Sequence, residues 1–399
     1  MDRTPGSGRG RWILGSFAGA EGLLSPAGGG QGLRSPSGSG TGPEGSEKGR
    51  GGEGGGPGGG TRPIRDSGGG DGGKDLSGQR DHHLRLRRAC SGSGGGLGMS
   101  RFLERLRREV ILFDGAMGTM LQQAGLAAGE CPELWNLERP EVVQGIHRAY
   151  LEAGAQVVET NTFGANRIKL GAYGLQGKVR ELNYWGARLA REVTPEGCFV
   201  AGSISPTGRF LQPLGDLSFS EVVEIYQEQI AALIEGGVDL LCVETMMDVE
   251  ETIAAVMAAH QVGPLPVAAT MTFNLGQVGF RTIMGISPEA AIRRLEEVGV
   301  DLLGSNCGNG MEEMILLMRQ MRPLTRSPLL AQPNAGVPRL VEGEAAYTQG
   351  PEEFARGVPE LLATGVNAIG GCCGTTPAHI RRVAREMRKA LGAESGRGE

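Results

Sequence analysis

From Met99 onward, short apolar segments and amphipathic helical patterns alternate eight times, a pattern that few folds accommodate. The apolar segments are rich in β-branched residues, which is typical of buried strands. Several helical patterns begin at an N-cap type of residue, such as Ser218, Asp248, Ser287 or Thr376, and several end at a glycine. Alternating strands and helices indicate a parallel sheet whose faces are both covered.

The eight repeats predict an α/β fold, a closed (β/α)8 TIM barrel. An open doubly wound sheet is the alternative, but it requires a glycine-rich phosphate loop after the first strand, and residues 114–119 lack the GxGxxG spacing. The predicted strands are residues 110–116, 156–163, 198–206, 239–246, 265–273, 301–308, 329–336 and 368–374. The predicted helices are residues 140–153, 178–193, 219–236, 249–260, 288–298, 312–321, 352–363 and 378–391, preceded by a short basic helix at 102–108.

The first 98 residues have a different composition from the rest of the 399-residue chain, since they hold 34 of its 70 glycines. They contain few aromatic or β-branched residues and cannot bury enough apolar surface to offset chain entropy. We therefore expect a disordered Gly/Ser/Arg-rich segment at 1–98 and one folded domain at 99–399. One hypothesis is that Met99 is the natural start of the protein.

Charge and hydropathy exclude two classes of function. From Met99 onward, 27 Lys or Arg stand against 36 Asp or Glu, which argues against a nucleic-acid partner. No apolar run approaches the roughly 18–20 residues that span a bilayer, so no membrane association is expected. Seven cysteines are too few and too unevenly placed for a disulfide scaffold, and a cytoplasmic location is expected.

The catalytic groups of a (β/α)8 barrel project from the carboxyl ends of its strands. Polar residues fall at six of these predicted ends. They are Asp114, Asn161 with Thr162, Glu244, Asn306 with Cys307, Asn334, and the pair Cys372 and Cys373. Three thiols are therefore expected to converge at one end of the barrel.

Three cysteinates with one open position suit a catalytic zinc ion. Neighbouring residues of a strand point to opposite faces, but glycines on both sides of Cys372 and Cys373 permit a bulge or turn that directs both sulfurs inward. Core packing of the three thiols and a vicinal disulfide redox centre are the alternatives. Among the other cysteines, Cys198 and Cys242 are predicted to pack in the core, and Cys131 to be a loop thiol.

Asp114 and Glu244 indicate a cationic group on the substrate, because an ammonium ion entering a partly dry site needs opposite charge. Structural ion pairs or helix caps are the alternative. The backbone N–H groups of residues 115–118 could bind a carboxylate. An amino acid that carries a thiol would satisfy the thiols, the carboxylates and the loop together.

At these residues the chain resembles the homocysteine S-methyltransferase family, over about residues 110–391. The resemblance rests on six stretches of sequence, of which the last is highly specific. They are FDGAMGT at 113–119, ETNTFGA at 159–165, ET at 244–245, NC at 306–307, PNAG at 333–336 and GGCCGTTP at 370–377.

The resemblance implies that Cys307, Cys372 and Cys373 bind Zn²⁺ and are catalytic. It further implies that the amino and carboxylate groups of homocysteine contact Asp114, Gly115 and Glu244, with Asn161 and Thr162 lining the pocket. Asn334 would approach the metal when substrate is absent.

The implied function is a zinc-dependent methyl transfer to the homocysteine thiol, forming methionine. The methyl donor is left open among S-methylmethionine, betaine, methylcobalamin and methyltetrahydrofolate. The sequence beyond Phe163 is most similar to modules of the methionine-synthase type, without a folate, reductase or cobalamin domain in this sequence. The alternatives are therefore a homocysteine-activating subunit of a split cobalamin-dependent methionine synthase, with a cobalamin-carrier protein as partner, and a non-enzymatic zinc or thiol sensor.

Overall fold

The structure is a computed structural model that describes residues 100–336, 339–341 and 344–394. The segment 1–98, predicted to be disordered, lies outside the described residues. Eight parallel strands form one sheet, in the neighbour order β1-β12-β9-β8-β5-β4-β3-β2. They are β1 (Ile111–Leu112), β2 (Val157–Glu159), β3 (Phe199–Ile204), β4 (Leu240–Met246), β5 (Val267–Met271), β8 (Leu302–Asn306), β9 (Leu329–Gln332) and β12 (Ala368–Ile369).

The sheet closes on itself between its two end strands, β1 and β2. Phe113, directly after β1, forms a parallel bridge with Val157 in β2. One residue earlier, the backbone N–H of Gln156 donates to the carbonyl of Leu112 at 2.7 Å. The predicted (β/α)8 barrel is confirmed, and the open-sheet alternative is wrong.

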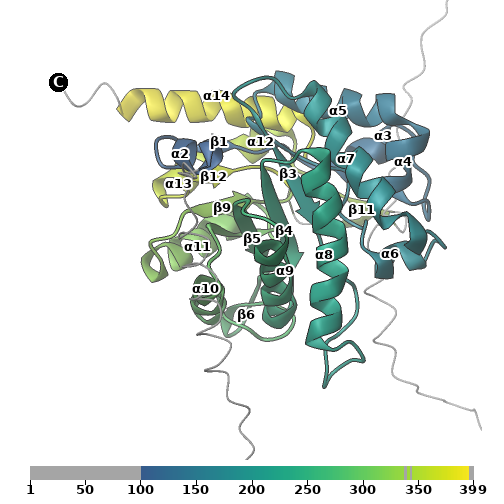
Figure 1. Cartoon of the computed structure of the whole chain (residues 1–399). Helices are drawn as coiled ribbons and strands as arrows, with labels where there is room; N and C mark the ends of the chain where they lie inside the picture. The colour runs from purple at the N-terminus through teal and green to yellow at the C-terminus, as the bar shows by residue number, and fades with distance from the viewer. Residues whose placement is uncertain (1–99, 337–338, 342–343, 395–399) are drawn as a thin grey trace, which may run out of the picture. The chain divides into compact units, whose positions relative to one another are not determined.

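Helices surround the strands in the order that the alternation predicts (Figure 1). Ser218 caps its helix in a capping box with Glu221, and Asp248 and Ser287 cap theirs, as predicted. The long helices are α5 (Pro140–Ala153), α7 (Val179–Val193), α8 (Phe219–Gly236), α9 (Val249–Val262), α10 (Pro288–Glu297), α11 (Met311–Met321) and α14 (Pro377–Glu394).

The single helix predicted at 352–363 is wrong, because two helices occupy this segment, α12 (Pro351–Ala355) and α13 (Val358–Ala363). Pro359 lies in the first turn of α13. A proline has no backbone N–H to continue the hydrogen bonds of the preceding helix, so the helix must restart there.

Several short elements were not predicted. Except for η4, they lie in the connections that follow β1, β2, β5 and β9, and so they surround the carboxyl end of the barrel. They are α3 (Met117–Gln123), η2 (Pro132–Leu134), α4 (Trp135–Glu138), α6 (Arg167–Gly171), η3 (Gln176–Lys178), η4 (Arg322–Leu324), the hairpin β6 (Asn274–Gly276) with β7 (Gly279–Arg281), and the hairpin β10 (Arg339–Val341) with β11 (Glu344–Ala346).

The short basic helix predicted at 102–108 is present as α2 (Arg101–Leu106), and it packs against the amino ends of the strands. Phe102 and Leu106 are buried in the cluster of side chains that fills the barrel interior. The ring of Phe102 stands edge-on to that of Phe199 at the start of β3, with 5.5 Å between their centroids. This helix therefore closes the end of the barrel opposite to the predicted site.

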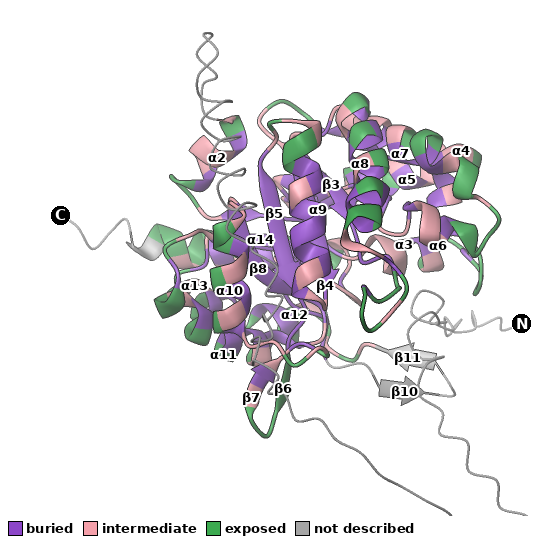
Figure 2. Ribbon diagram, turned by 60° about the horizontal axis from the view of Figure 1, so that its bottom comes forward, coloured by how far each residue is buried: buried purple, intermediate pink, exposed green. Residues whose placement is uncertain are grey.

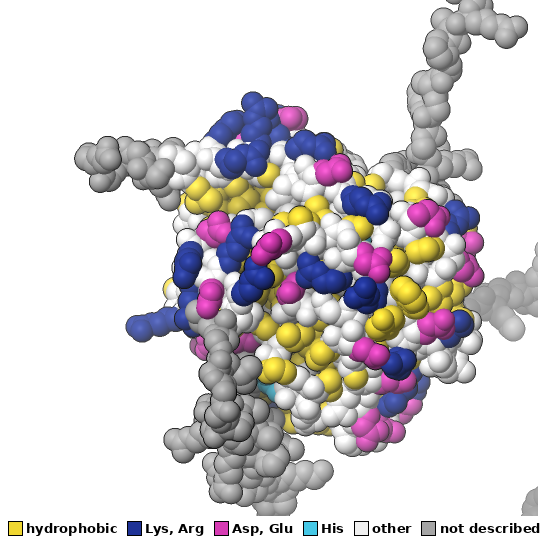
Figure 3. Space-filling model, turned by 45° about the horizontal axis from the view of Figure 1, so that its top comes forward, with side chains coloured by type: hydrophobic (Ala, Val, Ile, Leu, Met, Phe, Trp, Pro, Cys, Tyr) yellow, Lys and Arg dark blue, Asp and Glu magenta, His cyan; other side chains and the backbone are white. Residues whose placement is uncertain are grey.

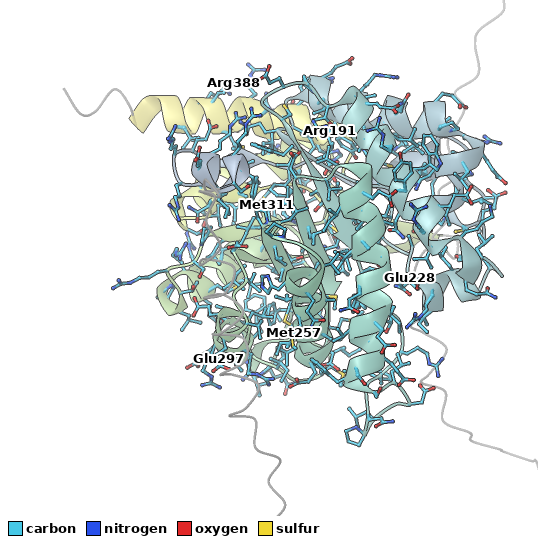
Figure 4. All side chains as sticks on the ribbon, in the orientation of Figure 1. Arg191, Glu228, Met257, Glu297, Met311 and Arg388 are labelled. Carbon is cyan, nitrogen blue, oxygen red and sulfur yellow. The ribbon has the colours of Figure 1, made fainter. Side chains whose placement is uncertain are left out.

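Burial follows the layers of the barrel: the strands are buried, and the helices bury one face and expose the other (Figure 2). Glu228 on α8 and Arg388 on α14 are exposed on the outer surface, whereas Met311 at the start of α11 is buried (Figure 4). Lys and Arg side chains are interspersed with Asp and Glu across the face seen in Figure 3. Within the described part of the chain, no helix is both long and apolar enough to cross a membrane.

Candidate metal and substrate site

The three predicted thiols come together at the carboxyl end of the barrel. The Sγ atom of Cys307, directly after β8, lies 3.9 Å from that of Cys373, and the Sγ atoms of Cys372 and Cys373 lie 4.0 Å apart. All three lie within 4.8 Å of one another, a spacing at which one metal ion can bind them. The cluster offers three sulfur ligands and leaves a fourth tetrahedral position to another group.

A turn, not a strand, presents the two neighbouring cysteines. The strand predicted at 368–374 ends already at Ile369, so Cys372 and Cys373 do not alternate across a sheet. The carbonyl of Cys372 accepts the N–H of Thr375 at 3.1 Å, and its own N–H donates to Pro333 at 2.9 Å. These bonds hold the turn against the end of β9 and direct both sulfurs to one side, as the flanking glycines predicted.

The glycines around this pair permit close contacts. A Cβ atom on Gly371 would lie 2.5 Å from the hydroxyl of Thr375. Gly374 has a φ of +80°, and a Cβ there would lie 2.3 Å from the ring of Tyr347. Both positions therefore require glycine for the turn to pack as it does.

The three thiols share their protons unequally. Hydrogen bonds from Cys372 and Cys373 hold the pKa of Cys307 well below its usual range. The same bonds, together with burial, raise the pKa of Cys372 and of Cys373. Tyr347 acts against this rise at Cys373 and lowers its pKa. These shifts favour negative charge on Cys307 over the other two sulfurs.

Three acidic side chains lie at the ends of β1, β2 and β4, at the same barrel opening; Asp114 and Glu244 are buried, and Glu159 is half-buried. Oδ2 of Asp114 accepts the N–H of Glu159 at 3.0 Å. Glu244 accepts the hydroxyl of Ser203 at 2.6 Å. The free Oδ1 of Asp114 and Oε1 of Glu159 are buried, and neither has a hydrogen-bond partner among the described residues.

Burial raises the pKa of each of these acids. Burial is the larger cause for Asp114 and Glu244, followed for both by the charge of Glu159. The pKa of Glu159 is raised by burial and is partly restored by hydrogen bonds from Cys242 and Gln332. Buried carboxylates with unpartnered oxygens are poised to accept a cationic group.

Two residues at this site have an uncommon backbone conformation. Thr245, after Glu244, has a φ of +58°, and Cys307 has a φ of +59°. Residues other than glycine rarely adopt this left-handed region, and such strain collects at functional sites. Here it turns the chain sharply at the ends of β4 and β8, where the carboxylate and the first thiol emerge.

The other predicted site residues lie at the same end of the barrel. Asn334 is buried with its Oδ1 unpartnered in the described structure, and its side chain hydrogen-bonds Cys307. Gly115 has no room for a side chain, since a Cβ would lie 2.5 Å from the hydroxyl of Thr375. The side chains of Asn161 and Thr162 are buried in bonds to neighbouring segments: Asn161 donates to Pro132 at 2.8 Å, and Thr162 to Ser203 at 2.8 Å.

Sequence reasoning placed Asn306 at a predicted strand end without giving it a role, and it did not nominate Glu159 or Tyr347. Glu159 is the last residue of β2, but the strand was predicted to continue to residue 163, so the rule that selected Asp114 passed over it. Tyr347 follows the β10–β11 hairpin, which was not predicted, and no local signal places it against Cys373.

One expectation about the remaining cysteines is wrong. Cys131 lies in a loop directly before η2, as predicted, and it is buried against Leu170 and Leu182. Cys198 is half-buried and not a core residue, since it precedes β3 at the amino end of the barrel. Cys242 is fully buried, as predicted.

The fold and the site together define a barrel enzyme with a thiol-lined site suited to a metal ion. The model of the family described as "Homocysteine S-methyltransferase" matches residues 111–387. The chain belongs to this family, which confirms the resemblance seen in the sequence.

Curated relatives include the methionine synthases of two mycobacteria. That of Mycobacterium leprae (strain TN) is 38% identical over 315 residues, covering 74% of this chain and 26% of the relative. That of Mycobacterium tuberculosis (strain ATCC 25618 / H37Rv) is 37% identical over 300 residues, covering 71% of this chain and 25% of the relative. The chain thus spans about a quarter of the length of these relatives.

Among solved structures, the homocysteine methyltransferase MmuM from Escherichia coli is similar over nearly its whole length. Its oxidized form is 26% identical with a TM-score of 0.59, covering 70% of this chain and 97% of MmuM. Its metallated form is 26% identical with the same TM-score of 0.59, covering 71% of this chain and 98% of MmuM.

Proposed function

We propose that this chain transfers a methyl group to the thiol of homocysteine and so forms methionine. The observation that carries this proposal is the convergence of three Sγ atoms within 4.8 Å, at the same barrel end as buried carboxylates with unpartnered oxygens. A substrate with both a thiol and an ammonium group fits this combination. In the transfer, the substrate sulfur forms a bond to the methyl carbon, and the donor leaves with the electron pair of the bond that breaks.

We propose Zn²⁺ as the metal, held by Cys307, Cys372 and Cys373. The donor set fits zinc, which favours thiolates and four ligands in a tetrahedron. When bound, Zn²⁺ supplies a positive charge that lowers the pKa of a substrate thiol in the fourth position, so that the thiol is ionised at neutral pH. Asn334, whose side chain lowers the pKa of Cys307 and whose Oδ1 is buried without a partner among the described residues, is proposed to approach this position when substrate is absent.

The remaining site residues are proposed to bind and orient homocysteine. Asp114 and Glu244 receive its ammonium group, because their negative charges are buried at one end of the barrel. The backbone N–H groups of the loop that begins at Gly115 are proposed to receive its carboxylate. Asn161 and Thr162 line the pocket from the segment after β2.

The methionine synthase relatives favour a second candidate function. In that case the chain activates homocysteine and receives its methyl group from a cobalamin held by a separate carrier protein. The candidate donors therefore fall into two classes. S-methylmethionine and betaine would let the chain act alone, whereas methylcobalamin or methyltetrahydrofolate would imply a partner.

A parallel donor assay tests these proposals. The full chain is purified with zinc and incubated with homocysteine and one isotopically labelled donor at a time: S-methylmethionine, betaine, methylcobalamin or 5-methyltetrahydrofolate. Labelled methionine, detected by mass spectrometry, identifies the reaction and the donor. Homocysteine binding without product favours the subunit of a split methionine synthase, and absence of homocysteine binding contradicts the proposed substrate.

A further inference from the structure

The side-chain amide of Asn306 connects the carboxylate of Glu244 to the sulfur of Cys372. Its Nδ2 atom lies 3.1 Å from Oε2 of Glu244 and 3.8 Å from Sγ of Cys372, and it also donates to the hydroxyl of Thr245 at 2.8 Å. Asn306 is fully buried. One donor group therefore serves both the predicted ammonium site and the predicted metal site.

The orientation of this amide is fixed by two donors at its oxygen. Oδ1 of Asn306 accepts the backbone N–H of Thr245 at 2.7 Å and the hydroxyl of Thr270 at 2.8 Å. An N–H and a hydroxyl both need an acceptor, so the oxygen must face them and the nitrogen must face Glu244 and Cys372. The amide can shift only if these bonds shift with it.

The amide also connects the two strained turns of the site. Thr245 and Cys307 both have a positive φ, and Asn306 bonds to the first of them and precedes the second in sequence. A conformation of this kind persists only where the surroundings hold it. A change in the bonds of Asn306 should therefore alter the backbone conformation at the ends of both β4 and β8.

We infer that Asn306 is a positioning residue that couples ammonium binding at Glu244 to the sulfur environment of the metal site. This inference rests on the proposed function. An ammonium group at Glu244 makes the carboxylate a poorer acceptor for the amide N–H. The amide then donates more fully to Cys372, and the charge on that sulfur is reduced only when the amino group of the substrate is in place.

The test uses the full chain loaded with Co²⁺, whose absorption band with thiolates reports on the sulfur atoms. Two thiols are titrated: homocysteine, and 4-mercaptobutyrate, which lacks the amino group. Thr270→Val removes the hydroxyl that holds Oδ1 of Asn306. Thr272→Val is the matched control on the same strand end, since its hydroxyl donates to the backbone carbonyl of Asn306 at 3.1 Å and not to the amide. Asn306→Ala removes the whole connection.

In the wild-type protein we expect homocysteine to bind at least about tenfold more tightly than 4-mercaptobutyrate. In Thr270→Val this preference should fall about fivefold or more, and the cobalt–thiolate band should shift before any thiol is added. Thr272→Val should stay within about twofold of wild type. Asn306→Ala should change both the preference for homocysteine and the cobalt–thiolate band more than Thr270→Val does. If Asn306→Ala does not load cobalt, the result for Thr270→Val decides alone.

The proposed coupling is wrong if Thr270→Val weakens the binding of both thiols equally, since a merely structural residue would have that effect. It is equally wrong if Thr270→Val and Thr272→Val behave alike. A wild-type spectrum that neither thiol changes would overturn the proposed function and this inference with it. If homocysteine changes the wild-type spectrum but Thr270→Val keeps the wild-type preference for homocysteine, only the coupling is overturned.

Discussion

Oδ2 of Asp114 accepts the backbone N–H of Glu159 at 3.0 Å, while the second oxygen of each carboxylate is buried without a partner among the described residues. The bond joins the ends of β1 and β2 at the point where the barrel closes. Burial raises the pKa of both acids, and a bound cation would stabilise their charged forms. This relationship is the basis of the first two predictions.

Asp114→Asn removes one negative charge and keeps the shape of the side chain. We expect the KM for homocysteine to rise about 10- to 100-fold, because a hydrogen bond between an ammonium ion and a carboxylate is lost. The steady-state kinetics of methyl transfer measure this change. Turnover of 4-mercaptobutyrate, which has no ammonium group, is the control, and an equal loss with both thiols would contradict an ammonium site.

Glu159→Gln tests the cost of burying the third acid. Because burial raises the pKa of Glu159, its contribution to folding stability is fully present below the unfolded pKa and is lost as the pH rises through the folded pKa. The Gln side chain does not ionise, so the variant does not lose this contribution as the pH rises. Thermal unfolding without substrate should show its Tm about 2–4 °C above that of wild type at pH 8, with a smaller difference at pH 5. A difference that grows toward acid pH would refute the assignment.

Cys372→Ala removes one of the three sulfur ligands. We expect the zinc content after dialysis to fall from near one atom per chain to near zero, and methyl transfer to fall more than about 100-fold. Elemental analysis of the dialysed protein measures the first quantity, and the donor assay measures the second. Cys198→Ala, a half-buried thiol outside the cluster, should keep both. A metal-free Cys372→Ala protein with full activity would end the zinc proposal.

Phe102→Ala tests the helix that closes the amino end of the barrel. The buried ring contacts Phe113 and Phe199, so its loss should lower the free energy of unfolding by about 3–5 kcal/mol. Denaturant unfolding measures the change. Leu103→Ala, on the same helix but only partly buried, should lower the free energy of unfolding clearly less. Zinc content should be unchanged in both variants, since the site lies at the other end of the barrel.

Much of the fold could be predicted from the sequence, because hydrophobic periodicity and capping residues are local signals. The bounds predicted for α5 and α8 agree with the structure at both ends. Except for β4, the strands were predicted too long at their carboxyl ends, as for β12, which ends at Ile369 and not at residue 374. The two hairpins were missed because each is a short excursion within a longer connection.

The residues that carry the chemistry of the site were predicted more fully than the residues that position them. Cys307, Cys372 and Cys373 could be identified because parallel strands bring their ends together. The role of Asn306 could not, since it depends on side-chain directions that arise only when Thr245 and Cys307 adopt a positive φ. Thr and Cys seldom adopt a positive φ, and the neighbouring sequence gives no signal that predicts it here.

The order of the site residues along the chain sets when the site can come into being during synthesis. Asp114, Glu159 and Glu244 all leave the ribosome before Cys307, and Cys372 and Cys373 leave in the last of the eight repeats. The turn that carries this pair is held by bonds to Pro333 and Ala335 at the end of β9. The acidic residues of the site are therefore synthesised first, and the set of three thiols is complete only when the last repeat has been made.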